Sequence, residues 1–175
     1  MKVEVAFVLN GEPVRLVVEP RELLGHILRE RLGCRGVHVA CGQGNCGACT
    51  VLVDNQAVRS CLLLAVQSRG RDIRTVANLT SDDCQLHPLQ AALKKAGGVQ
   101  CGYCTAGIIL SVLSFLDENP SPTPAAIREA LSGHICRCTG YTGIIEAVEQ
   151  YAQNTARADR AGSEEKGGDE RHEGQ

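Results

Sequence analysis

Hydrophobic and polar residues alternate in two short runs near the start of the sequence. These runs cover residues 3–9 (VEVAFVL) and 14–19 (VRLVVE), and their alternation and β-branched residues predict two strands. Asn10 and Gly11 lie between the runs, and both residue types tolerate the positive φ of a tight turn. The pattern therefore predicts a β-hairpin over residues 3–19.

The apolar spacing becomes helical after this hairpin. Residues 20–33 carry one apolar stripe with helical spacing, which predicts a helix. Residues 49–61 (CTVLVDNQAVRSC) alternate again, with Asp54 and Asn55 at the turn, and predict a second hairpin. Residues 72–78 (DIRTVAN) are predicted to add a last, short strand.

Helical patterns take over in the second half of the sequence. Four segments with helical periodicity are predicted to be helices: 87–97, 104–120, 123–133 and 142–153. Residues 157–175 are polar and rich in glycine, lack an apolar face, and are predicted to form a disordered tail. The sequence thus divides into a β-rich domain over 1–78, a helical domain over 79–156, and this tail.

Composition narrows the class of protein. The sequence has 175 residues, of which ten are Cys, and a formal net charge of −2. No basic run is present, so nucleic acid is not an expected partner. No secretory leader and no apolar run long enough to span a bilayer is visible, so we expect a cytoplasmic protein with reduced thiols. Many cysteines in a reducing compartment favour metal binding over disulfides.

The stretch 40–51 (ACGQGNCGACTV) contains two overlapping patterns. Its glycines match G-x-G-x-x-G, typical of a dinucleotide-binding turn, and its cysteines match C-x4-C-x2-C, the first three ligands of a plant-type iron–sulfur cluster. The nucleotide pattern needs a strand before it and a helix opening within it, whereas here a predicted helix precedes and a predicted strand follows. The order of elements therefore favours the metal.

A fourth cysteine from the second hairpin completes a set of thiolates. The candidate ligands of a first [2Fe–2S] cluster are Cys41, Cys46, Cys49 and Cys61. The glycines between them are Gly42, Gly44 and Gly47. Glycine lets the backbone adopt a positive φ and turn its N–H groups towards sulfur anions. Zinc is the alternative metal, although structural zinc sites favour paired C-x2-C knuckles.

A second group of cysteines lies in the helical half. Its members are Cys101, Cys104, Cys136 and Cys138, in the pattern C-x2-C…C-x-C. The pair Cys101 and Cys104 alone would suit a thioredoxin-like motif, but the βαβ context of that motif is absent. The spacing differs from that of plant ferredoxins, so a Zn(Cys)4 site stays open beside a second iron–sulfur cluster.

Three segments together closely resemble one protein family. GNCGACTV (44–51), VQCGYCTAG (99–107) and SGHICRCTGYTGI (132–144) resemble the small iron–sulfur subunit of the molybdenum hydroxylases, the superfamily of xanthine dehydrogenase, aldehyde oxidoreductase and aerobic carbon monoxide dehydrogenase. The resemblance covers about residues 3–153. It implies an α+β fold with an N-terminal β-grasp ferredoxin-like domain and a following four-helix domain, each of which holds one [2Fe–2S] cluster.

The resemblance also implies an electron path and partners. Electrons would pass from the molybdopterin centre of a large subunit to the helical domain's cluster, then to the ferredoxin-like domain's cluster, and then to FAD in a medium subunit. Gln100 resembles a family glutamine that hydrogen-bonds the pterin, and Cys138 resembles the cysteine nearest the pterin's amino group. The expected assembly is a heterotrimer or a dimer of heterotrimers. We find no catalytic acid, base or nucleophile in the sequence.

Some residues depart from the family pattern or fall outside it. Ala106 stands where the family often has proline, and Ala40 where it often has glycine, but neither change removes a ligand. Cys34 and Cys84 are predicted to be ordinary thiols. His38 is predicted to pack beside the first loop rather than to donate to sulfur. The alternatives to an electron-transfer subunit are a structural adaptor with two Zn(Cys)4 sites and a stand-alone ferredoxin.

Overall fold

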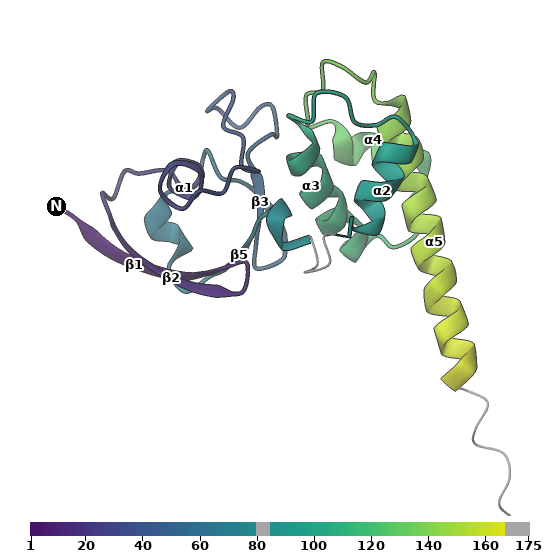
Figure 1. Ribbon diagram of the computed structural model, residues 1–175, viewed down its shortest axis with the longest axis horizontal. Coiled ribbons are helices and arrows are strands. Elements are labelled where there is room, and N and C mark those ends of the chain that lie inside the picture. Colours follow the sequence, from purple (N-terminus) through teal and green to yellow (C-terminus); the bar gives the residue numbers. More distant parts are fainter. Residues whose placement is uncertain (80–84, 167–175) are drawn as a thin grey trace, which may run out of the picture.

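The computed structural model describes residues 1–79 and 85–166, and side chains as far as residue 157. A sheet from the first half of the chain lies beside a group of helices from the second half (Figure 1). Within the described residues, no helix combines the length and the apolar character that crossing a membrane requires. The order of a β-rich half and a helical half agrees with the predicted α+β fold class.

The β-rich half is built on a mixed, five-stranded sheet. Its strands are β1 (Val3–Leu9), β2 (Glu12–Val18), β3 (Thr50–Val53), β4 (Gln56–Arg59) and β5 (Asp72–Arg74). They lie in the order β2-β1-β5-β3-β4. Strands β1 and β5 are parallel and the other neighbours are antiparallel. The first and last strands of this half therefore pair in the middle of the sheet, and β2 and β4 form its two edges.

Both predicted hairpins are present, and their turns have the backbone conformation that their residues favour. Asn10 and Gly11 have φ values of 52° and 88°, and Asp54 and Asn55 have values of 49° and 70°. Positive φ at both central residues is typical of a type I′ turn, whose twist suits a two-residue hairpin. Asn10 also accepts a hydrogen bond from the N–H of Thr75 (2.8 Å), which ties the first turn to the end of β5.

One helix packs against the sheet, and it is shorter than the sequence predicts. It consists of α1 (Leu24–His26) and a π-helical turn, η1 (Ile27–Arg31), instead of a helix over 20–33. The helix begins late because Leu23 pairs with Leu64 in an isolated β-bridge. Sheet and helix enclose an aliphatic core that includes Val5, Phe7, Leu24, Ile27, Leu28, Val51 and Ile73.

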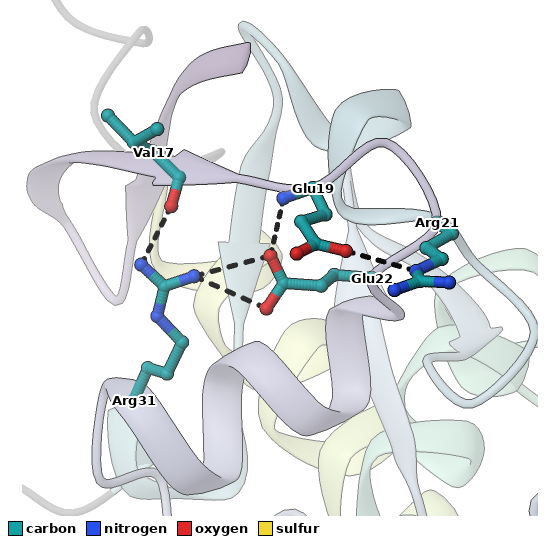
Figure 2. Close-up of polar contacts among 5 residues, drawn as sticks. All are labelled: Val17, Glu19, Arg21, Glu22 and Arg31. Carbon is teal, nitrogen blue, oxygen red and sulfur yellow. Dashed lines mark hydrogen bonds and ion pairs between the residues drawn. The ribbon is translucent and has the colours of Figure 1, made fainter. Parts of the chain in front are cut away.

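Arg31 fastens the end of η1 to the edge of the sheet (Figure 2). Its Nη2 donates to the carbonyl oxygen of Val17 in β2 (2.8 Å), and its Nη1 lies 3.4 Å from the carboxylate of Glu22. Glu22 in turn accepts a hydrogen bond from the backbone N–H of Glu19 (2.6 Å). Because β2 is an edge strand, the occupied carbonyl removes one acceptor with which another strand could pair.

The helical half contains the four predicted helices. They are α2 (Pro88–Lys95), α3 (Thr105–Glu118), α4 (Pro124–Leu131) and α5 (Thr142–Lys166). Thr123 caps α4 by accepting a hydrogen bond from the N–H of Ala126 (3.2 Å). The four helices enclose a second aliphatic core that includes Leu89, Leu93, Ile108, Ile109, Ile127, Leu131, Ile144 and Val148.

Helix α5 runs further than the sequence predicts. A disordered tail is expected over 157–175, but the helix continues to Lys166. Alanine, arginine and glutamate favour helix and are frequent in this stretch, which explains the continuation. The end of α5 projects away from the other helices (Figure 1). The rest of the predicted tail, 167–175, lies outside the described residues.

The two halves meet where α3 packs against β3 and β4. The hydroxyl of Ser114 in α3 donates to the carbonyl oxygen of Asn55 and accepts from the N–H of Ala57, both at 3.1 Å. Helix α3 begins directly after Cys104, and β4 ends shortly before Cys61. We use the word seam for this contact region between the halves, because it brings a cysteine-bearing segment of each half together.

We expect Asn10→Ala to lower the free energy of unfolding by about 2 kcal/mol, because it removes the hydrogen bonds to Thr75 and leaves alanine at positive φ. Asn10→Gly removes the same hydrogen bonds without the conformational cost, so its loss should be roughly half as large. Chemical denaturation followed by circular dichroism measures both. Equal losses in the two variants would contradict the role of the backbone conformation at this turn.

Candidate metal centres

The first group of cysteines lies on the loop between η1 and β3, and its fourth member follows β4. The loop changes direction at Gly42, Gly44 and Gly47, whose φ values are 65°, 79° and 76°. A Cβ at Gly44 would also meet Cδ1 of Leu62 at 2.5 Å. The loop thus has the positive φ values that the sequence predicts at its glycines, and a side chain at Gly44 would displace that of Leu62.

Backbone N–H groups of this loop point at the sulfur atom of Cys41. Gln43 and Cys46 donate to its Sγ at 3.4 Å and 3.5 Å. The hydrogen bond from Gln43, followed by that from Cys46, lowers the pKa of Cys41 to about 6. Cys41 therefore favours the thiolate, which is the form that binds a metal.

Cys49 and Cys61 form the inner side of the first group. Only 1% and 2% of their surfaces are exposed. Burial, followed by the neighbouring thiol of Cys49, raises the pKa of Cys61 to about 11. A buried thiol of this kind ionises when a positive charge such as a metal ion compensates it. The first group therefore has an outer thiol poised as thiolate and an inner thiol that needs a metal to ionise.

The second group surrounds the start of α3. Cys101 and Cys138 are exposed, and their sulfur atoms lie 3.6 Å apart. Cys104 is buried at the N-cap of α3, and burial, followed by the neighbouring Cys136, raises its pKa to about 12. Burial also raises the pKa of Cys136, but hydrogen bonds from Thr139 and from the N–H of Cys138 outweigh it, so the net pKa is lowered.

The thiols of each group come together two by two. The pairs are Cys41 with Cys46, Cys49 with Cys61, Cys101 with Cys138, and Cys104 with Cys136. In the part of the chain that the structure describes, no three His, Cys, Asp or Glu side chains converge on the position of one ion. A [2Fe–2S] cluster takes two thiolates on each iron, and thiols that lie in pairs are compatible with this arrangement.

The hydroxyl of Tyr141 holds the turn that carries Cys136 and Cys138 of the second group. Tyr141 accepts a hydrogen bond from the N–H of Cys136 (2.8 Å) and donates to the carbonyl oxygen of His134 (2.9 Å). Thr139 places its hydroxyl 3.1 Å from the sulfur atom of Cys136. These two side chains fix the backbone around Cys136 and supply a donor beside its sulfur.

The two cysteine-bearing segments touch each other directly at the seam. The N–H of Ile135 donates to the carbonyl oxygen of Cys46 (3.0 Å), which joins the neighbour of Cys136 to a member of the first group. The first turn of α3 also lies against the first loop, because a Cβ at Gly107 would overlap the carbonyl oxygen of Gly47. Glycine at this position permits the two backbones to approach so closely.

A buried histidine fills the space between the two segments. His134 is 2% exposed, and its Nε2 lies 2.7 Å from the hydroxyl of Ser111. Burial, followed by the charge of Arg59, lowers the pKa of His134 to about 4, so the imidazole is neutral near pH 7. Arg59 donates to the carbonyl oxygen of Gly133 (2.8 Å) and to the hydroxyl of Thr50, and so spans both halves.

Gln100 and Cys138, the predicted contacts to a pterin, lie on an open edge of the second group. Gln100 is exposed beside the exposed Cys101. His38 was predicted to pack without a specific role, but its Nδ1 lies 2.8 Å from the carbonyl oxygen of Tyr103. The structure therefore gives His38 a polar contact with the second group that its position beside the first loop did not indicate.

The two remaining cysteines were predicted to be ordinary thiols. Cys34 is half-buried, burial raises its pKa, and its Sγ faces the carbonyl oxygen of Leu32 at 4.0 Å. A thiol with a raised pKa is a poor nucleophile near neutral pH. Cys84 lies outside the described residues.

Sequence reasoning missed the residues that join the two segments. Arg59 and Ser111 carry no motif, and the burial of His134 depends on packing between distant parts of the chain. Gly107 is the exception, because an isolated glycine inside a helical pattern is a weak signal of close backbone packing. At the start of the segment 104–120, that signal could have predicted a close approach of another backbone to the helix.

Two family models match the chain in the order of its two halves. The family described as a 2Fe-2S iron-sulfur cluster binding domain matches residues 7–89. The family described as a [2Fe-2S] binding domain matches residues 75–149. Both matches include the four cysteines of the corresponding group.

Relatives and solved structures are similar over most of the chain. The nicotine 6-hydroxylase small subunit of Paenarthrobacter nicotinovorans is 49% identical, over 84% of this chain and 88% of that protein. The caffeine dehydrogenase subunit gamma of Pseudomonas sp. (strain CBB1) is 41% identical, over 86% and 92%. A chain of quinoline 2-oxidoreductase from Pseudomonas putida 86 superposes with a TM-score of 0.84 and 42% identity, over 89% and 97%.

We expect Gly107→Ala to destabilise the protein by about 1–3 kcal/mol, because its Cβ would overlap the backbone of Gly47, which has little freedom to move. Gly133→Ala is the matched control. Its Cβ would meet only Nη2 of Arg59, at 2.8 Å, and the end of a long side chain moves easily. Calorimetry of the metal-loaded chain should show the larger fall in unfolding temperature for Gly107→Ala. A fall of the same size in the control would refute a tight backbone contact at the seam.

Proposed function

The chain belongs to the family of small iron–sulfur subunits of the molybdenum hydroxylases, and we propose that each of its two cysteine groups holds one [2Fe–2S] cluster. The chain is an electron-transfer subunit of a multi-subunit oxidoreductase. A [2Fe–2S] cluster supplies a site that gains and releases electrons singly. The protein's own residues fix where such a site lies and how stable its reduced form is.

The ligand sets follow from the two groups of thiols. We assign the first cluster to Cys41, Cys46, Cys49 and Cys61, and the second to Cys101, Cys104, Cys136 and Cys138. The thiol pairs described above support two ligands on each iron. N–H groups directed at Cys41 and donors beside Cys136 would stabilise negative charge on these sulfur atoms.

The contact between the two segments supports a relay through the chain. The hydrogen bond from Ile135 to the carbonyl oxygen of Cys46 connects the immediate neighbourhoods of the two sites without an intervening side chain. His134 is 2% exposed and lies directly against Gly47 of the first loop. This direct contact is the observation that carries the proposal, since a relay needs two centres held close in one rigid arrangement.

The open edge of the second group is the proposed entry point for electrons. Exposed apolar side chains lie within three residues of the exposed Cys101 and Cys138 in the sequence: Val99, Tyr103 and Ile135 are 36%, 45% and 59% exposed. Such a rim suits burial against another subunit. We propose that a molybdopterin-binding large subunit docks on it, with Gln100 and Cys138 nearest the pterin.

Electrons would leave at the first group. Cys41 and Cys46 are partly exposed, and Leu62 beside the loop is 59% exposed. We propose that an FAD-binding medium subunit receives electrons from this side. The complete assembly would be a heterotrimer or a dimer of heterotrimers, and the large subunit would choose and oxidise the substrate.

Metal and sulfide analysis of the anaerobically purified chain tests the central proposal. We expect iron and acid-labile sulfide in the amounts that two [2Fe–2S] clusters require. Reduction with dithionite should produce two distinguishable EPR signals. Zinc in place of iron, with no reducible chromophore, would refute the electron relay and leave a structural adaptor with two Zn(Cys)4 sites.

We expect Cys104→Ala to remove the iron of the second cluster and one of the two EPR signals, because the cluster then lacks one of its four proposed thiolates. Cys34→Ala is the matched control, and it should retain all of the iron and both signals. Iron analysis and EPR after dithionite reduction measure the difference. Loss of iron from Cys34→Ala, or full iron in Cys104→Ala, would overturn the ligand assignment.

A further inference from the structure

His38 belongs to the first half of the chain but contacts the second group of cysteines. It lies three residues before Cys41 in the sequence. Its Nδ1 lies 2.8 Å from the carbonyl oxygen of Tyr103, and the two rings stack with centroids 4.5 Å apart and an interplanar angle of 17°. A carbonyl oxygen only accepts, so Nδ1 carries the proton and donates. One side chain therefore joins the two sites by a directed hydrogen bond.

The acceptor of this hydrogen bond occupies a special place in the second group. Tyr103 lies between Cys101 and Cys104, and its carbonyl belongs to the peptide bond that leads to Cys104. The N–H of the same peptide is that of Cys104, whose sulfur is a proposed ligand of the second cluster. A hydrogen bond accepted at one end of a peptide strengthens the donor at its other end, because the two groups polarise each other.

We propose that His38 is a positioning residue that raises the reduction potential of the second cluster from across the seam. The proposal rests on the proposed function, which places that cluster on Cys104. His38 polarises the peptide between Tyr103 and Cys104, so the N–H of Cys104 becomes a stronger donor to sulfur. Hydrogen bonds to the sulfur atoms stabilise the reduced, more negative cluster.

The arrangement links the potential of one site to the position of the other half. His38 belongs to the first half and Tyr103 to the second, so the contact forms only while the halves stay docked. If the halves separate, the second site loses the donor that His38 supplies. The chain would then hold an electron less strongly at the second cluster.

Three substitutions separate the hydrogen bond from the stacking. His38→Phe keeps a ring against Tyr103 and removes the donor. His38→Asn removes the ring and keeps an N–H near the position of Nδ1. Tyr103→Phe keeps both the ring and the peptide and serves as the control. In each case the full chain is purified anaerobically, its iron is measured, and the two EPR signals are titrated against potential.

The EPR signal that changes or disappears in Cys101→Ser is assigned to the second cluster. We expect His38→Phe to lower the equilibrium constant for reduction of that cluster about threefold, which is ~30 mV for a one-electron couple. His38→Asn and Tyr103→Phe should stay close to the original protein, and the first cluster's potential should change little in all three.

Equal shifts in His38→Phe and His38→Asn, or no shift in either, would overturn the proposal. The iron content and the EPR signals of the unmodified chain are measured first. If iron or either signal is missing there, the proposed function fails, and this result is distinct from a failure of the His38 proposal. A variant that loses iron is replaced by His38→Leu, which also lacks the donor. If His38→Leu leaves the potential unchanged, the proposal is again refuted.

Discussion

The backbone contact between Gly47 and Gly107 is the constraint on which the geometry of both cysteine groups depends. Each half has its own aliphatic core, and Val76 of the first half also packs against the core of the second. The seam adds this backbone contact and polar groups such as Arg59 and Ser114. Glycine lets backbone meet backbone, and closely packed backbones cannot slide without losing contact. Two residues without side chains therefore set the separation of the two sites.

The thiols around this contact differ in how readily they ionise, and this difference affects how each one would bind a metal. Backbone donors lower the pKa of Cys41 to about 6, whereas burial and then Cys136 raise that of Cys104 to about 12. An exposed sulfur is thus prepared for a metal by N–H groups, whereas a buried thiol ionises when a metal ion compensates its charge. Metal binding must release protons from the buried thiols, so its free energy is coupled to the folding of both segments.

Local patterns predicted most elements, and distant packing decided the rest. Alternation and Asn10-Gly11 located the first hairpin because strand and turn preferences act within a few residues. The late start of α1 was not predictable, since it depends on Leu23 pairing with the distant Leu64. Spacing and resemblance grouped the cysteines, but they indicated neither the pairs nor the burial of His134. These features arise only when the two halves meet.

Two contacts of the seam join the surroundings of one cysteine group to those of the other. Ile135 bonds Cys46, and His38 bonds the peptide before Cys104. The same contacts therefore determine the distance between the sites and the donors around their sulfur atoms. Two separate ferredoxins could change distance and potential independently. In the relay that we propose, a shift of one half would alter both at once, so docking of the halves would control distance and potential together.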